Sequence, residues 1–476
     1  MRKILDERER MERQQHRRLI ITETLMFLSV ILLVGFLTLV VMGYTFNLRG
    51  LDGSGEVVER TGLVQVSSLP TGATIYIDGG TSLLFNTNAS RAVLSGEHEI
   101  SLARGGFDGW KKTVNVAEGM IYRLNYPRVC KEEREAEVAT EFAKPVEFVT
   151  VSPNNERMVF LQDGKLFMVN LNENVLVQKE LEVMDIDGSV VKITTFANVE
   201  WSGNSERMLA KANGKWVVIN VRDPKAAMWL SEIVSEEGEM KELSFAAETG
   251  ERVLMTNARK ELVEWSIREK KLSEALVKNV EAFDNDGERV IYTTRGLKGW
   301  QVRTYRVGDV ESPLVAEQEV KPIAKAMRYF QEFYVGVVTE EFTVYRRAGW
   351  PTGDGEMEKV FEERVGFSSS DLKKRGKGMV FELVGESGET KVFDIEAMKI
   401  MAVDTTGCGW VDEYLRYRLK DGKLSVLDYD GLNERGMVAT GVLTGRKVVI
   451  SGNNRWLYYF TSDKKGTEKL VREKIN

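Results

Sequence analysis

The sequence predicts an all-β protein that is preceded by one membrane-spanning helix. Three observations support this fold class: a long uncharged apolar run near the start of the chain, many short apolar segments that end at glycine-containing turns, and a strand–turn–strand unit that recurs later in the chain. The 476 residues include 42 glycines and only 8 prolines, a balance typical of short strands joined by tight turns. A chain of this length predicts roughly two to four domains.

The apolar run extends from Leu25 to Tyr44 and contains no charged residue. A helix of about 20 residues is about 30 Å long and matches the hydrocarbon core of a bilayer. We therefore predict a transmembrane helix over residues 19–44 and a short cytoplasmic tail over residues 1–18. The alternative is a cleaved signal peptide, but the run is longer than the roughly 7–15 apolar residues of such a peptide.

The charges around this run predict its orientation. Residues 1–18 carry seven basic and four acidic side chains, or +3, whereas the first basic residue after the run is Arg49. The positive-inside rule then places the N-terminus in the cytoplasm and the rest of the chain outside the membrane. Because the whole chain has a net charge of −6, the part after residue 18 carries −9, which argues against a nucleic-acid partner. The expected location is the cell membrane, with a single pass.

A small β domain follows a polar, glycine-rich stretch at residues 45–62, which we interpret as a flexible linker. Residues 63–127 then show short alternating segments separated by turn residues such as Pro70-Thr71-Gly72-Ala73. The expected strands are Leu63–Ser67, Thr74–Asp78, His98–Leu102, Lys112–Val116 and Ile121–Leu124. About five short strands of this kind predict a small β-sandwich.

Residues 63–127 resemble the PEGA domain family of bacterial surface proteins. The resemblance rests on the segment from Val64 to Gly79, on Leu94-x-Gly96-Glu97-His98 and on Gly106-Phe107. The eponymous Pro-Glu-Gly-Ala reads Pro-Thr-Gly-Ala here, and Thr81-Ser82-Leu83-Leu84 replaces the usual Gly-Thr-x-Pro. The resemblance implies an extracytoplasmic, sandwich-like module of an envelope protein, and it implies no catalytic residues.

One unit recurs from residue 146 onward. Ser152-Pro153-Asn154-Asn155-Glu156-Arg157-Met158 and Ser202-Gly203-Asn204-Ser205-Glu206-Arg207-Met208 lie 50 positions apart, and each precedes an apolar run, a Gly-Lys turn and a second run. Weaker copies continue to Arg455, with a mean step of about 43 residues, the length of a four-stranded propeller blade. We therefore predict a β-propeller over residues 146–476 with eight blades. Seven blades, or two sandwiches with coincidental spacing, are the alternatives.

The residues between the two β domains suggest how the ring closes. The last repeat ends at Asn476 without room for an outer strand, and residues 134–143, within the linker at 128–145, can supply that strand. The repeats resemble WD-repeat-like propellers only loosely, because no Gly-His…Trp-Asp signature is present.

Residues for catalysis are scarce. The only histidines are His16, in the predicted tail, and His98, at the start of a strand in the small domain, so histidine-based triads and zinc sites lack their key residue in the propeller. No GxGxxG or GxxxxGK[ST] motif occurs. The sequence therefore predicts no catalytic, cofactor-binding or metal-binding residues and no cofactor.

Two weaker motifs have simpler explanations. Ser370-Asp371-Leu372-Lys373 has S-x-x-K spacing but lacks its partner motifs, and we interpret it as a charged loop. Asp284, Asp286 and Gly287 could begin a calcium loop, but the glutamate expected at its twelfth position is missing, so a tight turn is favoured. Whether Cys130 and Cys408 pair is left open, although their wide separation favours two thiols.

Two tryptophans are candidate ligand contacts. Trp110 and Trp350 stand among glycines and polar residues, where exposed loop aromatics often anchor sugars or protein partners. The alternative is that each covers a hydrophobic edge. We expect a non-catalytic surface protein whose ectodomain binds a protein or an envelope glycan. The alternative function is a glycan-active enzyme that uses carboxylates at the propeller mouth, and a third hypothesis assigns recognition to the small domain.

Overall fold

The structure is a computed structural model, and its chain forms two compact units. They are Met1–Arg104 with Gly109–Arg128, and Gly105–Asp108 with Val129–Asn476. The residues that the structure describes are 22–38, 44–46, 58–234, 240–246, 248–306, 309, 312–347, 356–375, 378–463 and 466–476.

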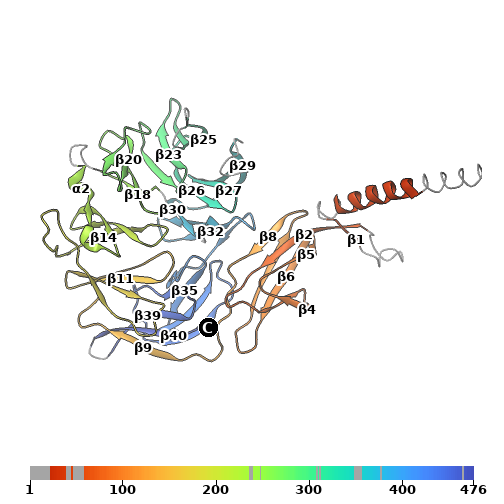
Figure 1. Ribbon diagram of the computed structural model, residues 1–476, viewed down its shortest axis with the longest axis horizontal. Helices are drawn as coiled ribbons and strands as arrows, with labels where there is room; N and C mark the ends of the chain where they lie inside the picture. The colour runs from red at the N-terminus through yellow and green to blue at the C-terminus, as the bar shows by residue number, and fades with distance from the viewer. Residues whose placement is uncertain are drawn as a thin grey trace, which may run out of the picture. The chain divides into compact units, whose positions relative to one another are not determined.

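The first unit contains a helix at residues 22–38 (Figure 1). Its large apolar side chains are exposed, from Leu25 at 60% to Leu37 at 52%. No helix in the described ranges is long and apolar enough to cross a membrane. The tail at 1–18 and both flanks of the predicted helix, residues 19–21 and 39–43, lie outside the described residues, whereas Tyr44 lies in a strand.

Two four-stranded sheets make up the rest of the first unit. One sheet contains β1 (Tyr44–Phe46), β2 (Val58–Val66), β5 (Ala89–Leu94) and β8 (Ile121–Leu124). The other contains β4 (Gly80–Asn86), β3 (Thr74–Ile77), β6 (Gly96–Ala103) and β7 (Trp110–Val116), in this order. Alternate residues of β7 are buried, so one face of its sheet contributes to a core, as in a small sandwich.

Two predictions for this unit were wrong in part. The predicted linker at 45–62 contains strand residues, because β1 pairs with the beginning of β2 through Tyr44 and Arg60. The stretch was interpreted from its glycines, but Val58 to Thr61 forms ladder hydrogen bonds that composition does not reveal. The sequence interpretation also missed β4 and β5. β5 pairs with β2 over Thr61–Val66, a long-range pairing that no local pattern announces.

The described part of the second unit contains eight sheets of four strands each. The first four are β10 (Phe148–Val151), β11 (Arg157–Gln162), β12 (Lys165–Asn170) and β13 (Lys179–Leu181); β14 (Phe196–Trp201), β15 (Arg207–Ala212), β16 (Lys215–Asn220) and β17 (Met228–Trp229); β18 (Leu243–Phe245), β19 (Arg252–Thr256), β20 (Leu262–Ser266) and β21 (Lys271–Leu272); and β22 (Ala282–Asn285), β23 (Val290–Arg295), β24 (Trp300–Tyr305) and β25 (Leu314–Gln318).

The other four sheets continue in chain order, and two short helices follow the third strand of the second sheet. Sheets five to eight are β26 (Ile323–Tyr329), β27 (Glu332–Val338), β28 (Glu341–Arg347) and β29 (Glu358–Arg364); β30 (Ser369–Arg375), β31 (Val380–Gly385), β32 (Thr390–Asp394) and β33 (Lys399–Ala402); β34 (Cys408–Trp410), β35 (Leu415–Lys420), β36 (Lys423–Asp428) and β37 (Arg435–Thr440); and β38 (Val449–Ile450), β39 (Trp456–Ser462), β40 (Glu468–Lys474) and β9 (Ala136–Glu141). The helices are η2 (Pro224–Ala226) and α2 (Leu230–Ile233).

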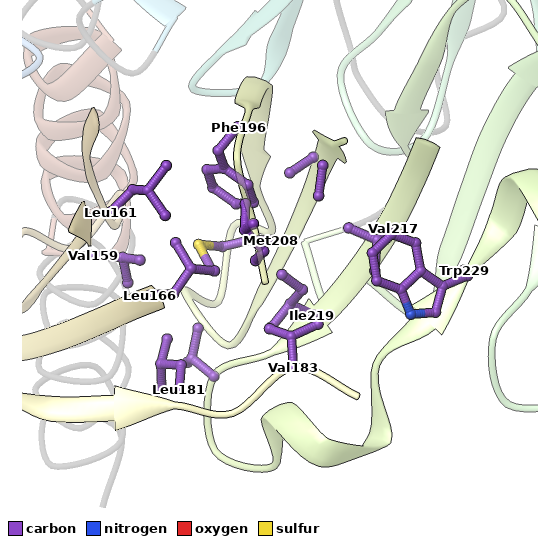
Figure 2. Packing of buried hydrophobic residues seen from close by; sticks show 14 residues of the cluster. Val159, Leu161, Leu166, Leu181, Val183, Phe196, Met208, Val217, Ile219 and Trp229 are labelled. Carbon is purple, nitrogen blue, oxygen red and sulfur yellow. The ribbon is translucent and has the colours of Figure 1, made fainter. Parts of the chain in front are cut away.

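Packing between neighbouring sheets arranges them in a ring (Figure 1). Figure 2 shows the contact between the first and second sheets, where Val159 and Leu166 meet Met208 and Ile219. Similar buried clusters join the second sheet to the third, the third to the fourth and the fourth to the fifth. The last sheet packs on the first, with Tyr458 and Phe160 in one cluster. The unit is therefore a β-propeller-like ring, as the repeat spacing predicted.

The ring closes with a strand from the N-terminal side of the unit. β9 pairs antiparallel with β40, so the segment expected at 134–143 completes the eighth sheet. Phe142, which follows β9, lies 5.1 Å from Phe160 of the first sheet and 5.7 Å from Phe460 of the last, centroid to centroid. The two ends of the ring therefore share one aromatic core.

The repeated serine and asparagine of the sequence form one turn that recurs between the first and second strands of a sheet. Ser152 donates to the side chain of Asn154 at 2.7 Å, and the same pair recurs at Ser202 and at Ser451 with the same distance. The residue after the accepting asparagine has a positive φ each time: 56° at Asn155, 62° at Ser205 and 57° at Asn454. The sequence repeat thus encodes a turn geometry.

Candidate central binding site

A pocket of about 750 Å³ opens where the first strands of five consecutive sheets converge. β14, β18, β22, β26 and β30 all contribute to its wall, and the first strands of adjacent sheets lie beside one another. We call it the central pocket. A second hollow of about 810 Å³, the side pocket, lies between the fifth and sixth sheets and shares Lys321 and Ile323 with it. The two hollows are therefore neighbours on either side of these two residues.

Hydrogen bonds connect the second, third and fourth sheets across the wall of the central pocket. Glu200 of β14 accepts hydrogen bonds from the Ser244 hydroxyl and the Phe245 backbone N–H of β18, both at 3.0 Å. Asn285 of β22 donates from its side-chain amide to the Ser244 oxygen at 3.0 Å. Each partner is supplied by the next sheet, so the first strands are held in register around the pocket.

Ion pairs continue this network through the fourth, fifth and sixth sheets. The carboxylate of Asp284 accepts a hydrogen bond from the Ala326 backbone N–H at 2.9 Å and lies 2.9 Å from Lys374 Nζ and 3.5 Å from Lys325 Nζ. Lys374, on β30, also donates to the Asn285 carbonyl at 2.8 Å, so its chain reaches the fourth sheet. Asp284 is therefore engaged by the wall of the pocket.

The Glu200 carboxyl has an unusual protonation equilibrium. Burial among the first strands raises its pKa to about 7, although the hydrogen bonds from Phe245 and Ser244 and the charge of Lys374 oppose the rise. Asp284 adds to the rise through like-charge repulsion. Near neutral pH the pocket therefore holds both protonated and ionised Glu200, so this side chain can donate as well as accept a hydrogen bond.

Two lysines that line the central pocket, Lys241 and Lys321, act on the nearby carboxylate of Glu281. Lys260, in the turn before β20, lies 2.5 Å from Glu281, which precedes β22. The Lys260 hydrogen bond lowers the pKa of Glu281, and the charges of Lys321 and Lys241 lower it further. Lys321 Nζ also lies 5.6 Å from the centroid of the Trp300 ring. Glu281 is thus paired with Lys260 and also feels the charges of Lys241 and Lys321.

The structure places the predicted contact residues elsewhere. Trp110 begins β7, is 1% exposed and packs edge-on against Tyr126 at 6.1 Å. The interpretation of Trp110 as an exposed loop aromatic was wrong, because β7 starts at this residue and directs its indole into the core of the first unit. Trp350 lies outside the described residues. Cys408 carries a free thiol, so it forms no disulfide with Cys130.

The sequence interpretation missed the central pocket. Ser370 to Lys373, expected in a loop, lies in β30, and Asp371 lines the pocket. Asp284, considered only for a calcium loop, is the centre of the ion-pair network, while Asp286 accepts turn hydrogen bonds from Glu288 and Arg289. Within the described ranges, no group of three or more metal-ligating side chains could hold an ion.

The fold and the pocket define an all-β protein with a small sandwich and a propeller-like ring that has a polar central pocket. Residues 61–128 match the PEGA domain family, which agrees with the resemblance noted in the sequence. A search of curated proteins found no match. The matched segment assigns the small domain to this family and leaves the ring to be described by its own geometry.

Solved structures similar to this chain include several propellers. The C-terminal WD40 domain of Sif2 is 9% identical, with 71% of this chain and 97% of that chain covered and a TM-score of 0.44. Dipeptidyl peptidase 4 of Porphyromonas gingivalis is 10% identical, with 71% of this chain and 58% of that chain covered and a TM-score of 0.46. The computationally designed Ika8 protein is 14% identical, with 70% of this chain and 98% of that chain covered and a TM-score of 0.40. Because every TM-score is below 0.5, the strand pairing carries the fold assignment.

Proposed function

We propose that the protein is a membrane-anchored surface protein that binds an extracytoplasmic ligand, an envelope protein or glycan, in the central pocket without chemically changing it. The observation that carries this proposal is the state of the pocket carboxylates. Asp284 is held by two lysines and a backbone N–H, and Glu200 by a hydroxyl and a backbone N–H. Each carboxyl group is therefore fixed in place, and its remaining lone pairs can accept hydrogen bonds from a ligand.

Filling the pocket tests this proposal. Ala324 lines the pocket, and Ala324→Trp would occupy part of it, whereas Ala397→Trp adds the same ring at an exposed turn of the sixth sheet. Both variants are compared with the wild-type chain in detergent micelles for the capture of purified envelope proteins and glycan fragments, after circular dichroism has verified folding. We expect only the Ala324 variant to lose capture. Equal capture by all three proteins would refute a central binding site.

Membrane anchoring is proposed from the uncharged run Leu25–Tyr44, the basic residues before it and the exposed apolar side chains of the helix at 22–38. The full chain should stay with the membrane after alkaline carbonate extraction, and a chain without residues 19–44 should be released. External protease on intact cells should digest the β domains. Release of the full chain by carbonate contradicts anchoring.

A glycan-active enzyme is the second candidate, because one observation favours it. Glu200, whose pKa burial raises to about 7, shares the pocket with the carboxyl group of Asp284. Glycoside hydrolysis uses a pair of carboxyl groups in which the general acid has a raised pKa. Assays for reducing ends released from envelope polysaccharides distinguish the two functions. Turnover that is lost in Glu200→Gln would replace the binding proposal with the enzyme.

A further inference from the structure

The charges around the central pocket differ between its interior and its rim. Inside, the carboxylates of Glu200 and Asp284 are engaged by neighbouring sheets. At the rim, Lys241 and Lys321 both line the pocket and both act on Glu281, which is already paired with Lys260. A cation that enters would have to displace groups that hold the wall together. An anionic group that enters would instead meet the amines of Lys241 and Lys321, which can donate hydrogen bonds to it.

The rim remains positive when its acidic neighbours are included. Glu242, the other carboxylate beside Lys241, accepts a long hydrogen bond of 3.4 Å from the Phe283 backbone. Asp371, which also lines the pocket, lies 3.7 Å from Lys373. Outside the pairs already described, the lining lysines Lys241 and Lys321 therefore face one carboxylate, that of Glu242. Within the described part of the chain, the Lys241 side chain makes no hydrogen bond or ion pair. The protein as a whole, in contrast to this rim, is acidic, with a net charge of −6. A positive rim on an acidic protein is an attachment point for an anion.

The shape and chemistry of the two pockets favour a sugar chain over a compact ligand. The central and side pockets are neighbours that share Lys321 and Ile323 in their walls, so a ligand held at Lys321 has a second hollow within reach of an extended chain. Asn198, which lines the central pocket, and Ser368, which lines the side pocket, are exposed and present an amide and a hydroxyl, which pair with sugar hydroxyls as donor or acceptor. Trp300, beside Lys321, offers an indole next to the anion site.

We propose that the ligand is an anionic oligosaccharide whose acidic groups bind Lys241 and Lys321 while its neutral hydroxyls reach the walls of the two neighbouring pockets. This inference rests on the proposed binding function and specifies its ligand. Carboxylate and sulfate groups share the relevant chemistry, because each presents oxygen acceptors with a negative charge to the lysine amines.

The experiment measures binding to the full-length chain in detergent micelles by titration calorimetry. The probes are oligogalacturonate, a sulfated dextran oligomer, a neutral malto-oligosaccharide of matched length and a poly-glutamate peptide. The variant K241Q/K321Q removes the rim amines. K399Q/K423Q removes the same charge from exposed lysines of the sixth and seventh sheets, which do not line either pocket.

We expect one or both anionic oligosaccharides to bind, the neutral one to bind weakly, and K241Q/K321Q to weaken binding about tenfold or more. The control pair should leave affinity unchanged, and added salt should weaken binding by screening. Binding of oligogalacturonate alone identifies carboxylate as the recognised group, and binding of both oligomers identifies negative charge.

Three results would overturn the inference: equal affinity for the neutral oligosaccharide, equal or tighter binding of poly-glutamate, or no effect of K241Q/K321Q. Each is compatible with a central binding site, which stands or falls with the Ala324→Trp comparison. Failure of the ligand class is therefore distinguishable from failure of the proposed function.

Discussion

At the scale of single residues, the buried carboxyl group of Glu200 makes the stability of the ring depend on pH. Burial raises the pKa to about 7 from the usual 4.5, so the folded state holds the proton more tightly than the unfolded state. This linkage stabilises the fold at low pH. The advantage declines as the pH rises above the unfolded pKa and is lost above the folded pKa.

Glu200→Gln should therefore change stability in a pH-dependent way. The amide cannot ionise, and its oxygen can still accept from Ser244 and Phe245. We expect the variant to be more stable than wild type by up to about 3 kcal/mol at pH 8.5 and to match it near pH 4. Solvent that reaches the carboxyl group makes the gain smaller. Urea unfolding of both chains at the two pH values measures this. A pH-independent difference would show that ionisation of Glu200 is not its cause.

His98 in the small domain gives a second residue-scale prediction. Its Nδ1 lies 2.6 Å from the Asp78 carboxylate and its Nε2 lies 2.7 Å from the Leu94 carbonyl, so both ring nitrogens face acceptors. Burial disfavours the charged ring, but these hydrogen bonds outweigh it and raise the pKa of His98. The same pair lowers the pKa of Asp78.

The ion pair of His98 and Asp78 should therefore stabilise the first unit at pH values between the pKa of Asp78 and the pKa of His98. Its contribution is complete between about pH 4 and 6.5, declines as pH rises through the raised His98 pKa, and declines again as pH falls through the lowered Asp78 pKa. Because Asp78 is exposed, His98→Asn should cost at most about 1 kcal/mol at pH 6 and less at pH 8.5. Thermal melts across this range, with Asp78→Asn as the partner variant, measure it, and a cost that grows with pH would contradict the assignment.

At the scale of elements, local patterns predicted well what the chain encodes locally. The Ser-x-Asn turns at Ser152, Ser202 and Ser451 repeat because each forms the same side-chain hydrogen bond, so the spacing predicted both strand positions and sheet number. β5 was missed because its extended conformation depends on pairing with β2, and the residues of β5 alone do not reveal this pairing.

The site was not predictable in the same way. Glu200, Asp284 and Lys374 come from three sheets, and nothing in their neighbours in sequence distinguishes them from other strand residues. Their proximity depends on closing the ring, which no short window of sequence describes. For Trp110, the glycines around it correctly predicted a turn, but the strand that follows already begins at the indole.

Contacts between elements also seal the seventh sheet to the sixth. Glu382 of β31 lies 3.3 Å from Arg375 and 4.0 Å from Arg416, and it accepts a hydrogen bond from the Trp410 indole at 2.9 Å. Arg416 is 2% exposed, and burial lowers its pKa. One carboxylate therefore compensates two guanidinium groups at this junction.

Removing that charge should destabilise the ring more than removing an exposed one. Glu382→Gln keeps an acceptor for Trp410 but leaves Arg416 buried without its counter-charge, so we expect a loss of about 3 kcal/mol in the free energy of unfolding. Glu386→Gln, on an exposed turn of the same sheet, is the control and should change it by less than about 0.5 kcal/mol. Equal effects in urea unfolding would show that the junction does not depend on the Glu382 charge.

At the scale of the whole molecule, the ring depends on joining residues that are far apart in sequence. β9 and Phe142 come from the start of the second unit, whereas β40 and Phe460 come from its end. Closing such a long loop costs entropy, which the contacts at the closure must offset. An unclosed ring would also expose the edge of β40 and the apolar faces of the first and last sheets.

Phe142→Ala tests the closure, because this phenyl ring packs on aromatic residues of both end sheets and is 2% exposed. The lost burial and the cavity should cost about 3–5 kcal/mol. Amide hydrogen exchange should rise first in β9, β40 and β10, ahead of the fourth and fifth sheets, because the ring opens where its ends meet. Phe330→Ala removes a ring that is 53% exposed and should cost far less. A uniform rise in exchange around the ring would instead mean that it unfolds as one unit, with no weak point at the closure.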